Sequence, residues 1–176
     1  SMDGVDLSLI KSDGFSEFTS VLNNYQEFDN KIQNDLINLR DKIFVSEDLE
    51  KYSKEINDLD RKITLFHAET IKNFLSNNQS QVDLIGFHGQ TIFHSSKEKV
   101  SKQLGNGKLL SQITKKIVIN NFRKQDLING GEGAPLTPIF HKLISKIINE
   151  KYKISFPINL INIGGITNIT QVSDSE

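Results

Sequence analysis

The sequence predicts an α/β fold in which helices flank a mixed or parallel sheet. Three short apolar segments, at residues 82–87, 117–119 and 157–163, have the length and the β-branched content of strands. Longer segments before and between them carry apolar residues every three or four positions, which is the period of an amphipathic helix. Strands that alternate with helices along a chain are typical of the α/β class.

The chain opens with a segment that alternates apolar and polar residues, at positions 5–10. This alternation predicts a half-buried strand. Ser12, Asp13 and Gly14 supply the turn chemistry that ends it. A strand so close to residue 1 needs a neighbour, and we expect its hairpin partner to lie before Ser1.

Two helical patterns follow the opening strand. The first covers residues 28–43, and the second runs from Leu49 towards Phe74 after an acidic N-cap at residues 46–48. The second pattern indicates either a core-facing amphipathic helix or a coiled-coil, partner-binding helix. Because its apolar stripe lapses at Thr70, before heptads are sustained, the core-facing interpretation is favoured.

The second half of the chain places polar or glycine-rich turns directly after its strands. Residues 88–91 follow the strand at 82–87, residues 120–123 follow the strand at 117–119, and the loop at 130–135 precedes a helix that begins with Thr137 and Pro138. The apolar face expected for that helix consists of Ile139, Phe140, Leu143, Ile144, Ile147 and Ile148. The strand at 157–163 is broken by Gly164 and Gly165 and resumes at 167–170.

The composition excludes several function classes. The 176 residues carry a net charge of −1, with 36% apolar and 24% charged residues, so no basic excess is available to bind nucleic acid. The absence of cysteine excludes disulfides, thiolate metal sites and thiol nucleophiles, and it is compatible with a cytoplasmic location. No apolar run approaches the length of a membrane span, and the first residues do not resemble a signal peptide.

Ligand-binding residues are expected in the turns that follow the strands, because open α/β sheets bind ligands at the carboxyl ends of their strands. Arg123 is the strongest single candidate, since its guanidinium can present a fixed fork to a sugar hydroxyl, a carboxylate or a phosphate. The alternative is a surface ion pair between Arg123 and Asp126. The chain has no Walker-type phosphate loop, no nucleophile elbow and no His-Glu-x-x-His motif.

The four histidines carry less information. His67 and His141 lie within predicted helices and are interpreted as structural or exposed residues. His88 taken alone is more typical of a structural histidine than of a catalyst, and the role of His94 stays open.

Six segments taken in order are far more specific than any one glycine-rich loop. They are residues 1–6 (SMDGVD), 86–91 (GFHGQT), 103–107 (QLGNG), 122–126 (FRKQD), 130–141 (GGEGAPLTPIFH) and 162–170 (NIGGITNIT). This series resembles the anhydro-N-acetylmuramic acid kinase family, and the resemblance spans the chain from its first residue to about Thr170.

The resemblance implies an actin/hexokinase-like sugar kinase with two α/β lobes, of which residues 1–176 form the N-terminal lobe, incomplete at both ends. The family uses ATP and Mg²⁺ to open the 1,6-anhydro ring of anhydro-N-acetylmuramic acid. The product is N-acetylmuramic acid 6-phosphate, made in the cytoplasm during peptidoglycan recycling. Such a reaction requires a phosphate cradle, a sugar clamp and a carboxylate base that activates water.

The resemblance also assigns residues to these parts. The phosphate cradle for ATP is implied at Ser1, Met2, Asp3, Gly4, Val5 and Asp6. The sugar site is implied at His88, Gly89, Gln90, Thr91, Arg123, Gly130 and Gly131, with Thr91 and Arg123 as the strongest candidates. No metal ligand is assigned, and the family's catalytic base belongs to a motif that lies beyond Glu176.

The sequence departs from the family in several respects. Family members are about twice as long, as two ~150-residue domains require, and their strand leading into Ser1 is absent here. Asn106 and Asn121 stand where the family has Asp, and Glu132 where it has Gln. An alternative origin of Ser1 and Met2 is a cloning scar followed by an initiator Met, but the family motif carries Ser at this position, which favours native sequence.

Two hypotheses follow. In the first, the chain is the N-terminal lobe of the kinase and has little or no activity alone, because the base and second lobe are missing. In the second, motivated by the two asparagines, it is a decayed, non-catalytic module that binds sugar or a partner. Half of a two-lobed protein exposes apolar surface, so aggregation or a homodimer is also expected.

Overall fold

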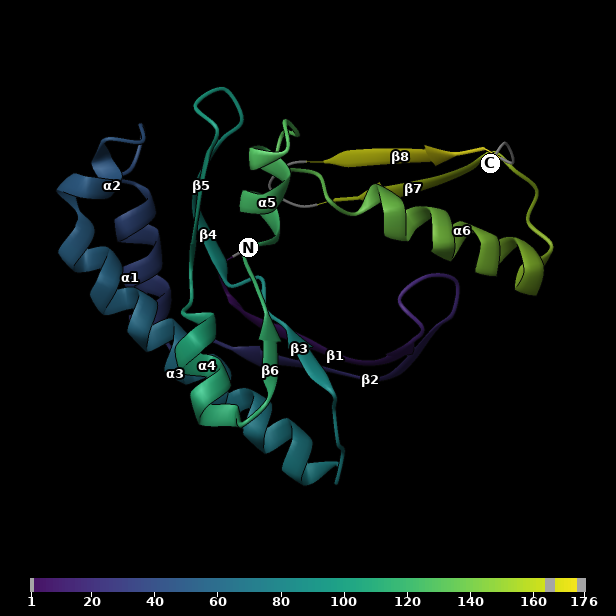
Figure 1. The fold of residues 1–176 in the computed structure, drawn as a ribbon, viewed down its shortest axis with the longest axis horizontal. Coiled ribbons are helices and arrows are strands. Elements are labelled where there is room, and N and C mark those ends of the chain that lie inside the picture. The colour runs from purple at the N-terminus through teal and green to yellow at the C-terminus, as the bar shows by residue number, and fades with distance from the viewer. Residues whose placement is uncertain (1, 164–166, 174–176) are drawn as a thin grey trace. The chain divides into compact units, whose positions relative to one another are not determined.

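The structure is a computed structural model that describes residues 2–163 and 167–173. Its strands are β1 (Gly4–Ser12), β2 (Phe18–Glu27), β3 (Leu84–Gly86), β4 (Gln90–Ser95), β5 (Val100–Leu104), β6 (Ile117–Ile119), β7 (Ile158–Asn162) and β8 (Asn168–Val172). Its helices are α1 (Asn30–Arg40), α2 (Asp48–Lys51), α3 (Ser53–Asn77), α4 (Gly107–Thr114), α5 (Phe122–Ile128) and α6 (Pro138–Tyr152) (Figure 1). The predicted α/β class is confirmed. Ser1, Gly164 and Gly165 lie outside the described residues.

The strands of the described residues pair two by two, so the single mixed sheet that the sequence predicts is not observed. β3 and β6 run parallel, with Leu84 opposite Ile117 and Gly86 opposite Ile119. β4 pairs with β5 and β7 with β8 in antiparallel ribbons, and β1 pairs with β2. Three of the four pairs join strands that are consecutive in the chain, which keeps each ribbon local and small.

The chain divides into two compact units. The larger unit comprises Met2–Leu7 and Asn23–Ala134, and the smaller unit includes Ser8–Leu22 and the chain from Pro135 onward. The candidate site residues that the structure describes all belong to the larger unit.

Within the described residues β1 forms a hairpin with β2, a partner that the sequence did not predict, and a strand before Ser1 on the other edge of β1 stays a prediction. β2 was not predicted from the sequence, because its residues, which are almost all exposed, lack the alternation of apolar and polar residues that marks a half-buried strand. The turn chemistry at residues 12–14 is confirmed. The Asp13 carboxylate accepts the backbone N–H groups of Glu17, Phe15 and Ser16, and these bonds hold the pKa of Asp13 well below its usual range.

Helices α1 and α3 are formed by the two apolar stripes seen in the sequence. The Asp29 carboxylate caps α1 by accepting the Ile32 N–H at 2.7 Å, and the stripe of α3 buries Ile56, Leu59, Ile63, Ala68, Ile71 and Phe74. The core-facing interpretation of the second stripe is therefore confirmed. That stripe forms two helices, because the short α2 ends before α3 begins at Ser53.

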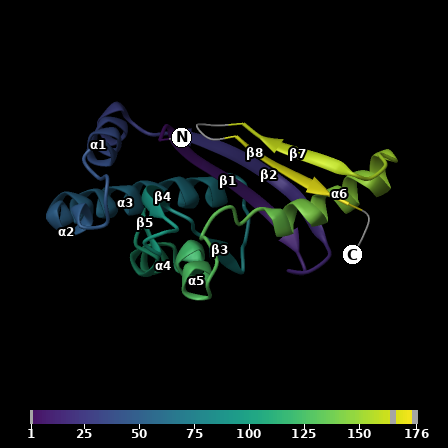
Figure 2. The same ribbon diagram turned by 90° about the horizontal axis from the view of Figure 1, so that it is seen from above.

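Two clusters of buried side chains form the core of the larger unit. The first joins Val5 and α1 to α3 and the β4–β5 ribbon, and the second joins α3 to Phe87 and to Leu110 of α4. Figure 2 shows α3 from a second direction. No helix among the described residues has both the length and the apolar character needed to cross a bilayer.

In the smaller unit, α6 lies along the β7–β8 ribbon (Figure 1). Its N-terminus has Pro138 in the first turn, as predicted, but the Thr137 side chain makes no capping bond. The apolar face predicted for α6 is not fully buried, since Ile139 is 86% exposed. The reason is that a two-stranded ribbon covers less of a helix than a wide sheet does. The His141 Nδ1 atom lies 2.7 Å from the Thr170 hydroxyl oxygen.

His67 gives the larger unit a testable pH dependence. Its ring is buried, and its Nδ1 atom lies 2.8 Å from the Ile63 carbonyl oxygen. Burial lowers the pKa of His67 below its ordinary value of 6.5, although the hydrogen bond to Ile63 opposes this shift. The unfolded chain therefore binds a proton more readily than the folded one, and stability is lost as pH falls through the unfolded pKa.

We expect the urea midpoint of the larger unit to fall as pH is lowered from 7.5 to 5.5. The fall should be smaller in His67→Gln, which has no titrating ring. Equal slopes in the two proteins would show that His67 is not the group responsible.

Candidate functional site

Parallel pairing of β3 with β6 brings two of the predicted turns to the same edge. His88 and Gly89 follow the carboxyl end of β3, and α5 begins shortly after the carboxyl end of β6. As a result the Arg123 Nε–H donates to His88 Nε2 at 2.9 Å. Residues that are 35 positions apart in the chain thus meet where α/β folds bind ligands.

The hydrogen bonds of His88 define its tautomer. Its Nδ1 atom lies 2.9 Å from the Gly89 carbonyl oxygen, which can only accept, so Nδ1 carries the proton. Nε2 is then the acceptor for Arg123. Since both ring nitrogens are occupied, His88 orients Arg123 and is not available as a proton acceptor in this arrangement.

The glycine loop holds the other side of Arg123. The Arg123 Nη1–H donates to the Gly133 carbonyl oxygen at 2.9 Å. The Asp126 carboxylate accepts the Gly133 N–H at 2.7 Å, and the Lys99 ammonium donates to the Gly131 carbonyl at 2.9 Å. Arg123 and Asp126 therefore both bind the loop, which argues against the alternative that they serve mainly as a surface ion pair.

Arg123 is half-buried, and desolvation lowers its pKa. It stays charged at neutral pH, because arginine has a very high intrinsic pKa. With Nε and Nη1 fixed by protein acceptors, the remaining N–H groups of the fork can face a ligand oxygen.

Thr91 lies in β4, so the expectation that residues 88–91 form one turn is wrong for Gln90 and Thr91. The Thr91 hydroxyl oxygen is 3.3 Å from Gln103 Nε2, which also donates to the Ser101 hydroxyl at 2.8 Å. The Ser101 hydroxyl lies 3.1 Å from His94 Nδ1. Antiparallel pairing of β4 with β5 creates this row of polar side chains.

His94 connects this row to the glycine loop. Desolvation and the charge of Arg123 lower the pKa of His94, while a hydrogen bond to the Glu132 backbone and the charge of Glu132 oppose the shift. A Cβ atom on Gly133 would lie 3.0 Å from the His94 ring. A row of polar contacts therefore runs from Thr91 through Gln103 and Ser101 to His94, and the His94 ring lies close to Gly133 in the loop that holds Arg123.

Ser101 and Gln103 were not predicted as site residues, and the sequence left the role of His94 open. A hairpin read over residues 90–104, with its turn at 96–99, would have placed the three side chains beside Thr91. The sequence indicates this hairpin only weakly, because its two strands are short and polar and the register shifts between Thr91 and Phe93.

The two asparagines that replace aspartate in the resemblance have structural roles. The Asn106 side-chain oxygen accepts the Leu109 N–H and caps α4, a task that Asn and Asp perform about equally. Asn121 precedes α5 with φ of 60°, a left-handed conformation that asparagine tolerates well.

The segment predicted to bind ATP is described from Met2 onward. Val5 is buried in the core, and the Asp3 carbonyl accepts the Phe28 N–H at 2.8 Å. Desolvation, followed by the negative charges of Asp3, Glu27 and Asp6, raises the pKa of Tyr25. The surroundings of this segment are therefore acidic.

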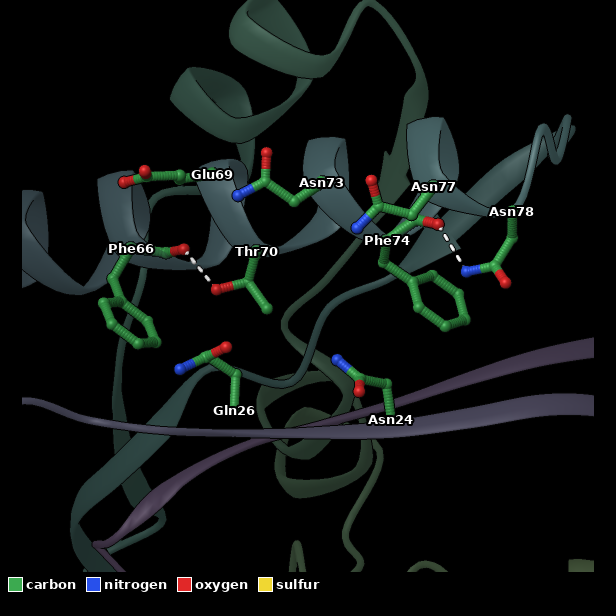
Figure 3. A pocket seen from close by; sticks show the side chains of 9 residues that line it. All are labelled: Asn24, Gln26, Phe66, Glu69, Thr70, Asn73, Phe74, Asn77 and Asn78. Carbon is green, nitrogen blue, oxygen red and sulfur yellow. Dashed lines mark hydrogen bonds between the residues drawn. The ribbon is translucent and has the colours of Figure 1, made fainter.

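A separate groove of about 510 Å³ lies between β2 and α3 (Figure 3). Its lining comprises Asn24, Gln26, Phe66, Glu69, Thr70, Asn73, Phe74, Asn77 and Asn78. No residue predicted for the sugar or ATP site is among them. Within the part of the chain that the structure describes, no group of three or more His, Asp or Glu side chains is placed to hold a metal ion.

The fold and the site define an α/β protein with a preorganised arginine beside a glycine loop, which is an arrangement suited to an oxygen-rich small molecule. The family model for anhydro-N-acetylmuramic acid kinase matches residues 1–176. The chain therefore belongs to the anhydro-N-acetylmuramic acid kinase family.

Curated relatives carry the same name. The enzyme of Pelagibacter ubique is 54% identical over 172 residues, which is 98% of this chain and 45% of the relative. Those of Agrobacterium fabrum and Brucella suis are 31% and 33% identical, over 99% of this chain and 47% of each relative. The chain thus spans about half the length of the curated relatives it matches.

Proposed function

We propose that the protein containing this chain is an ATP-dependent kinase of anhydro-N-acetylmuramic acid and that residues 1–176 are the N-terminal lobe of an actin/hexokinase-like fold. The observation that carries the proposal is the arginine centre: the family motif residues His88, Arg123 and Gly133 are hydrogen-bonded together. Together with the family match over the whole chain, this supports a sugar site built by His88, Gly89, Gln90, Thr91, Arg123, Gly130 and Gly131.

The proposed reaction is a hydrolysis coupled to phosphoryl transfer. A water molecule attacks C1 of the anhydro sugar, the C1–O6 bond breaks, O6 takes the γ-phosphoryl group of ATP, and ADP leaves. The proton of the water passes to a carboxylate base outside residues 1–176. Arg123 and Thr91 bind and orient the sugar: the guanidinium is fixed by His88 and Gly133, and the Thr91 hydroxyl belongs to the polar row of the β4–β5 ribbon.

Met2, Asp3, Gly4, Val5 and Asp6, with Ser1 before them, form the nucleotide side of the proposed site. The carboxylates of Asp3, Asp6 and Glu27 would repel a bare polyphosphate, so ATP fits there only with Mg²⁺ to neutralise part of its charge. Mg²⁺ would supply charge stabilisation during phosphoryl transfer. We propose that the reaction takes place in the cytoplasm. We also propose that the protein forms a homodimer.

The alternative of a decayed binding module was motivated by Asn106 and Asn121, and the structure gives each of these residues a structural role. Asn106 caps α4 as an aspartate would, and Asn121 occupies a conformation that suits it. Each asparagine therefore has a structural role of its own, so the two substitutions give no support to decay.

Two measurements on the chain test the proposal. In calorimetric titration we expect anhydro-N-acetylmuramic acid to bind residues 1–176. In a coupled assay of ADP release we expect little or no turnover, because the base lies outside the chain. A relative of full length serves as the positive control. The absence of heat at millimolar sugar would contradict the proposed site, and turnover equal to that of the control would contradict the assignment of the base.

A further inference from the structure

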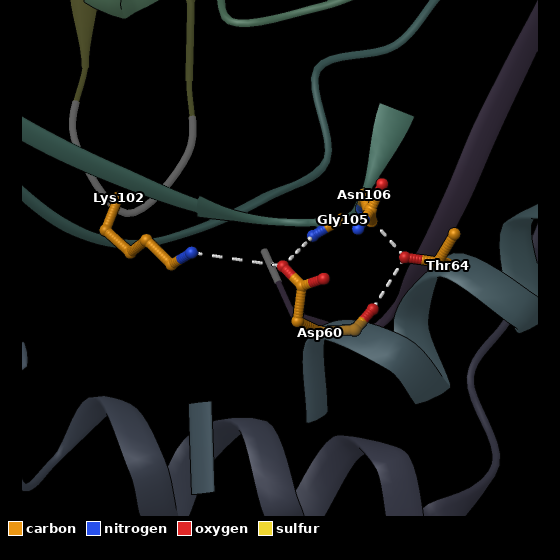
Figure 4. Close-up of polar contacts among 5 residues, drawn as sticks. All are labelled: Asp60, Thr64, Lys102, Gly105 and Asn106. Atoms are coloured by element: carbon orange, nitrogen blue, oxygen red, sulfur yellow. Dashed lines mark hydrogen bonds and ion pairs between the residues drawn. The ribbon is translucent and has the colours of Figure 1, made fainter. Parts of the chain in front are cut away.

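Helix α3 carries two polar side chains on its packed side that bind a distant turn. The Asp60 carboxylate accepts the Gly105 N–H at 2.9 Å, and the Thr64 hydroxyl oxygen accepts the Asn106 N–H at 2.8 Å (Figure 4). The Thr64 hydroxyl also donates to the Asp60 carbonyl at 2.6 Å. The Thr64 side chain is fully buried, so its hydroxyl is shielded from water and the loss of its partner is costly.

The turn held by α3 is locked against the turn that carries His88. Gly105 has φ of +125°, and a Cβ atom there would overlap the Phe87 ring and lie 3.5 Å from Gly89 Cα. Gly89 has φ of +69°, and a Cβ atom there would collide with the Leu104 carbonyl oxygen. The two turns are therefore packed closely, with no room for a side chain at either glycine, and this packing is the route by which a displacement of Gly105 would reach Gly89.

His88 lies next to Gly89 and determines the position of Arg123, since its Nε2 accepts the Arg123 Nε–H. A mechanical connection therefore runs from α3 through residues 105–106 and 87–89 to the arginine. The Lys102 ammonium lies 3.9 Å from the Asp60 carboxylate and balances part of its charge.

We propose that Asp60 and Thr64 are positioning residues that hold the His88–Gly89 turn, and through it Arg123, in the geometry that binds the sugar. This inference rests on the proposed function of that turn. Neither residue is among those predicted for the sugar site, and neither belongs to the motifs that indicated the site in the sequence.

The test compares Thr64→Val and Asp60→Ala with two matched variants. Thr64→Ser keeps the hydroxyl, and Asp58→Ala removes an exposed carboxylate from the same helix. The first readout uses the ligand-free chain: amide hydrogen exchange at Gly105, Asn106 and Gly89, together with the NMR signal of the Arg123 Nε–H. The second readout is the affinity for anhydro-N-acetylmuramic acid.

In Thr64→Val and Asp60→Ala we expect amide exchange at Gly105 and Gly89 to accelerate about tenfold relative to the parent chain, while exchange in α1 stays unchanged. The NMR signal of the Arg123 Nε–H should shift. The affinity for the sugar should fall about tenfold, which is the size of one hydrogen bond to a charged or buried group. Thr64→Ser and Asp58→Ala should behave as the parent chain does. Exchange that accelerates equally in α1 and in the turns would show a purely structural role and overturn the proposal. So would an unchanged affinity in a chain whose turns have loosened.

Failure of the proposed function would look different. If the parent chain binds no sugar, the function assigned to the site fails, while the exchange rates and the Arg123 signal still decide whether α3 holds the turn.

Discussion

Gly89→Ala is expected to lower the free energy of unfolding of the larger unit by about 3 kcal/mol. A left-handed backbone costs alanine about 1 kcal/mol, and forcing a methyl group into a packed contact costs about 2 kcal/mol more. Both terms apply at Gly89, where φ is +69° and the new Cβ atom would meet the Leu104 carbonyl oxygen. The measurement is urea unfolding followed by circular dichroism.

Gly130→Ala is the matched control, since Gly130 lies in the same unit. Gly130 also has a positive φ, of +91°, but nothing lies within 4 Å of its Cβ position. We therefore expect a loss of only about 1 kcal/mol there. Equal losses at the two positions would show that the contact between the 87–89 and 104–105 segments is looser than the structure indicates.

Arg123→Lys is expected to weaken binding of anhydro-N-acetylmuramic acid by about 10- to 100-fold. Arg123 donates at the same time to His88 Nε2 and to the Gly133 carbonyl, which the single ammonium of lysine cannot reproduce with the same directions. A lost hydrogen bond to a charged group costs about 1.5–3 kcal/mol, which corresponds to that range of affinity. Calorimetric titration of the chain measures the effect.

Arg61→Lys makes the same chemical change at an exposed position of α3 and should leave the affinity unchanged. His88→Gln should produce a smaller loss than Arg123→Lys, because a glutamine oxygen can still accept from Arg123. Full affinity in Arg123→Lys would remove Arg123 from the proposed site, provided that its urea midpoint matches that of the parent chain.

Local patterns were reliable where a single segment contained the whole signal. The stripe that runs from Leu49 towards Phe74 produced α2 and α3, and Asp13 produced the turn after β1. Sequence patterns failed to predict strands whose residues do not alternate between buried and exposed. β2 is exposed along nearly its whole length, and the β4–β5 ribbon is short and irregular, so neither shows the alternation by which strands are recognised.

The candidate site was predicted as a set of segments and not as an arrangement. The motif order identified His88, Arg123 and the glycine loop, and the structure joins them through hydrogen bonds of 2.9 Å. Ser101 was missed, since a side chain next to a site carries no mark in a single sequence. Gln103 stands in the segment 103–107, but it was not assigned to the site. Asp60 and Thr64 were missed because they act on the site through a turn more than 40 residues away.

The amino-acid sequence by itself determined the α/β class, the helical stripes, the family and the choice of Arg123 as the leading candidate site residue. Each of these depends on neighbouring residues or on motif order. Only the tertiary structure decided that β1 pairs with β2, that His88 holds Arg123, and that α3 holds the turn beneath them. These outcomes depend on which backbone and side-chain groups meet across long stretches of chain, and hydrogen bonds between distant residues are selected by the packing of the whole unit.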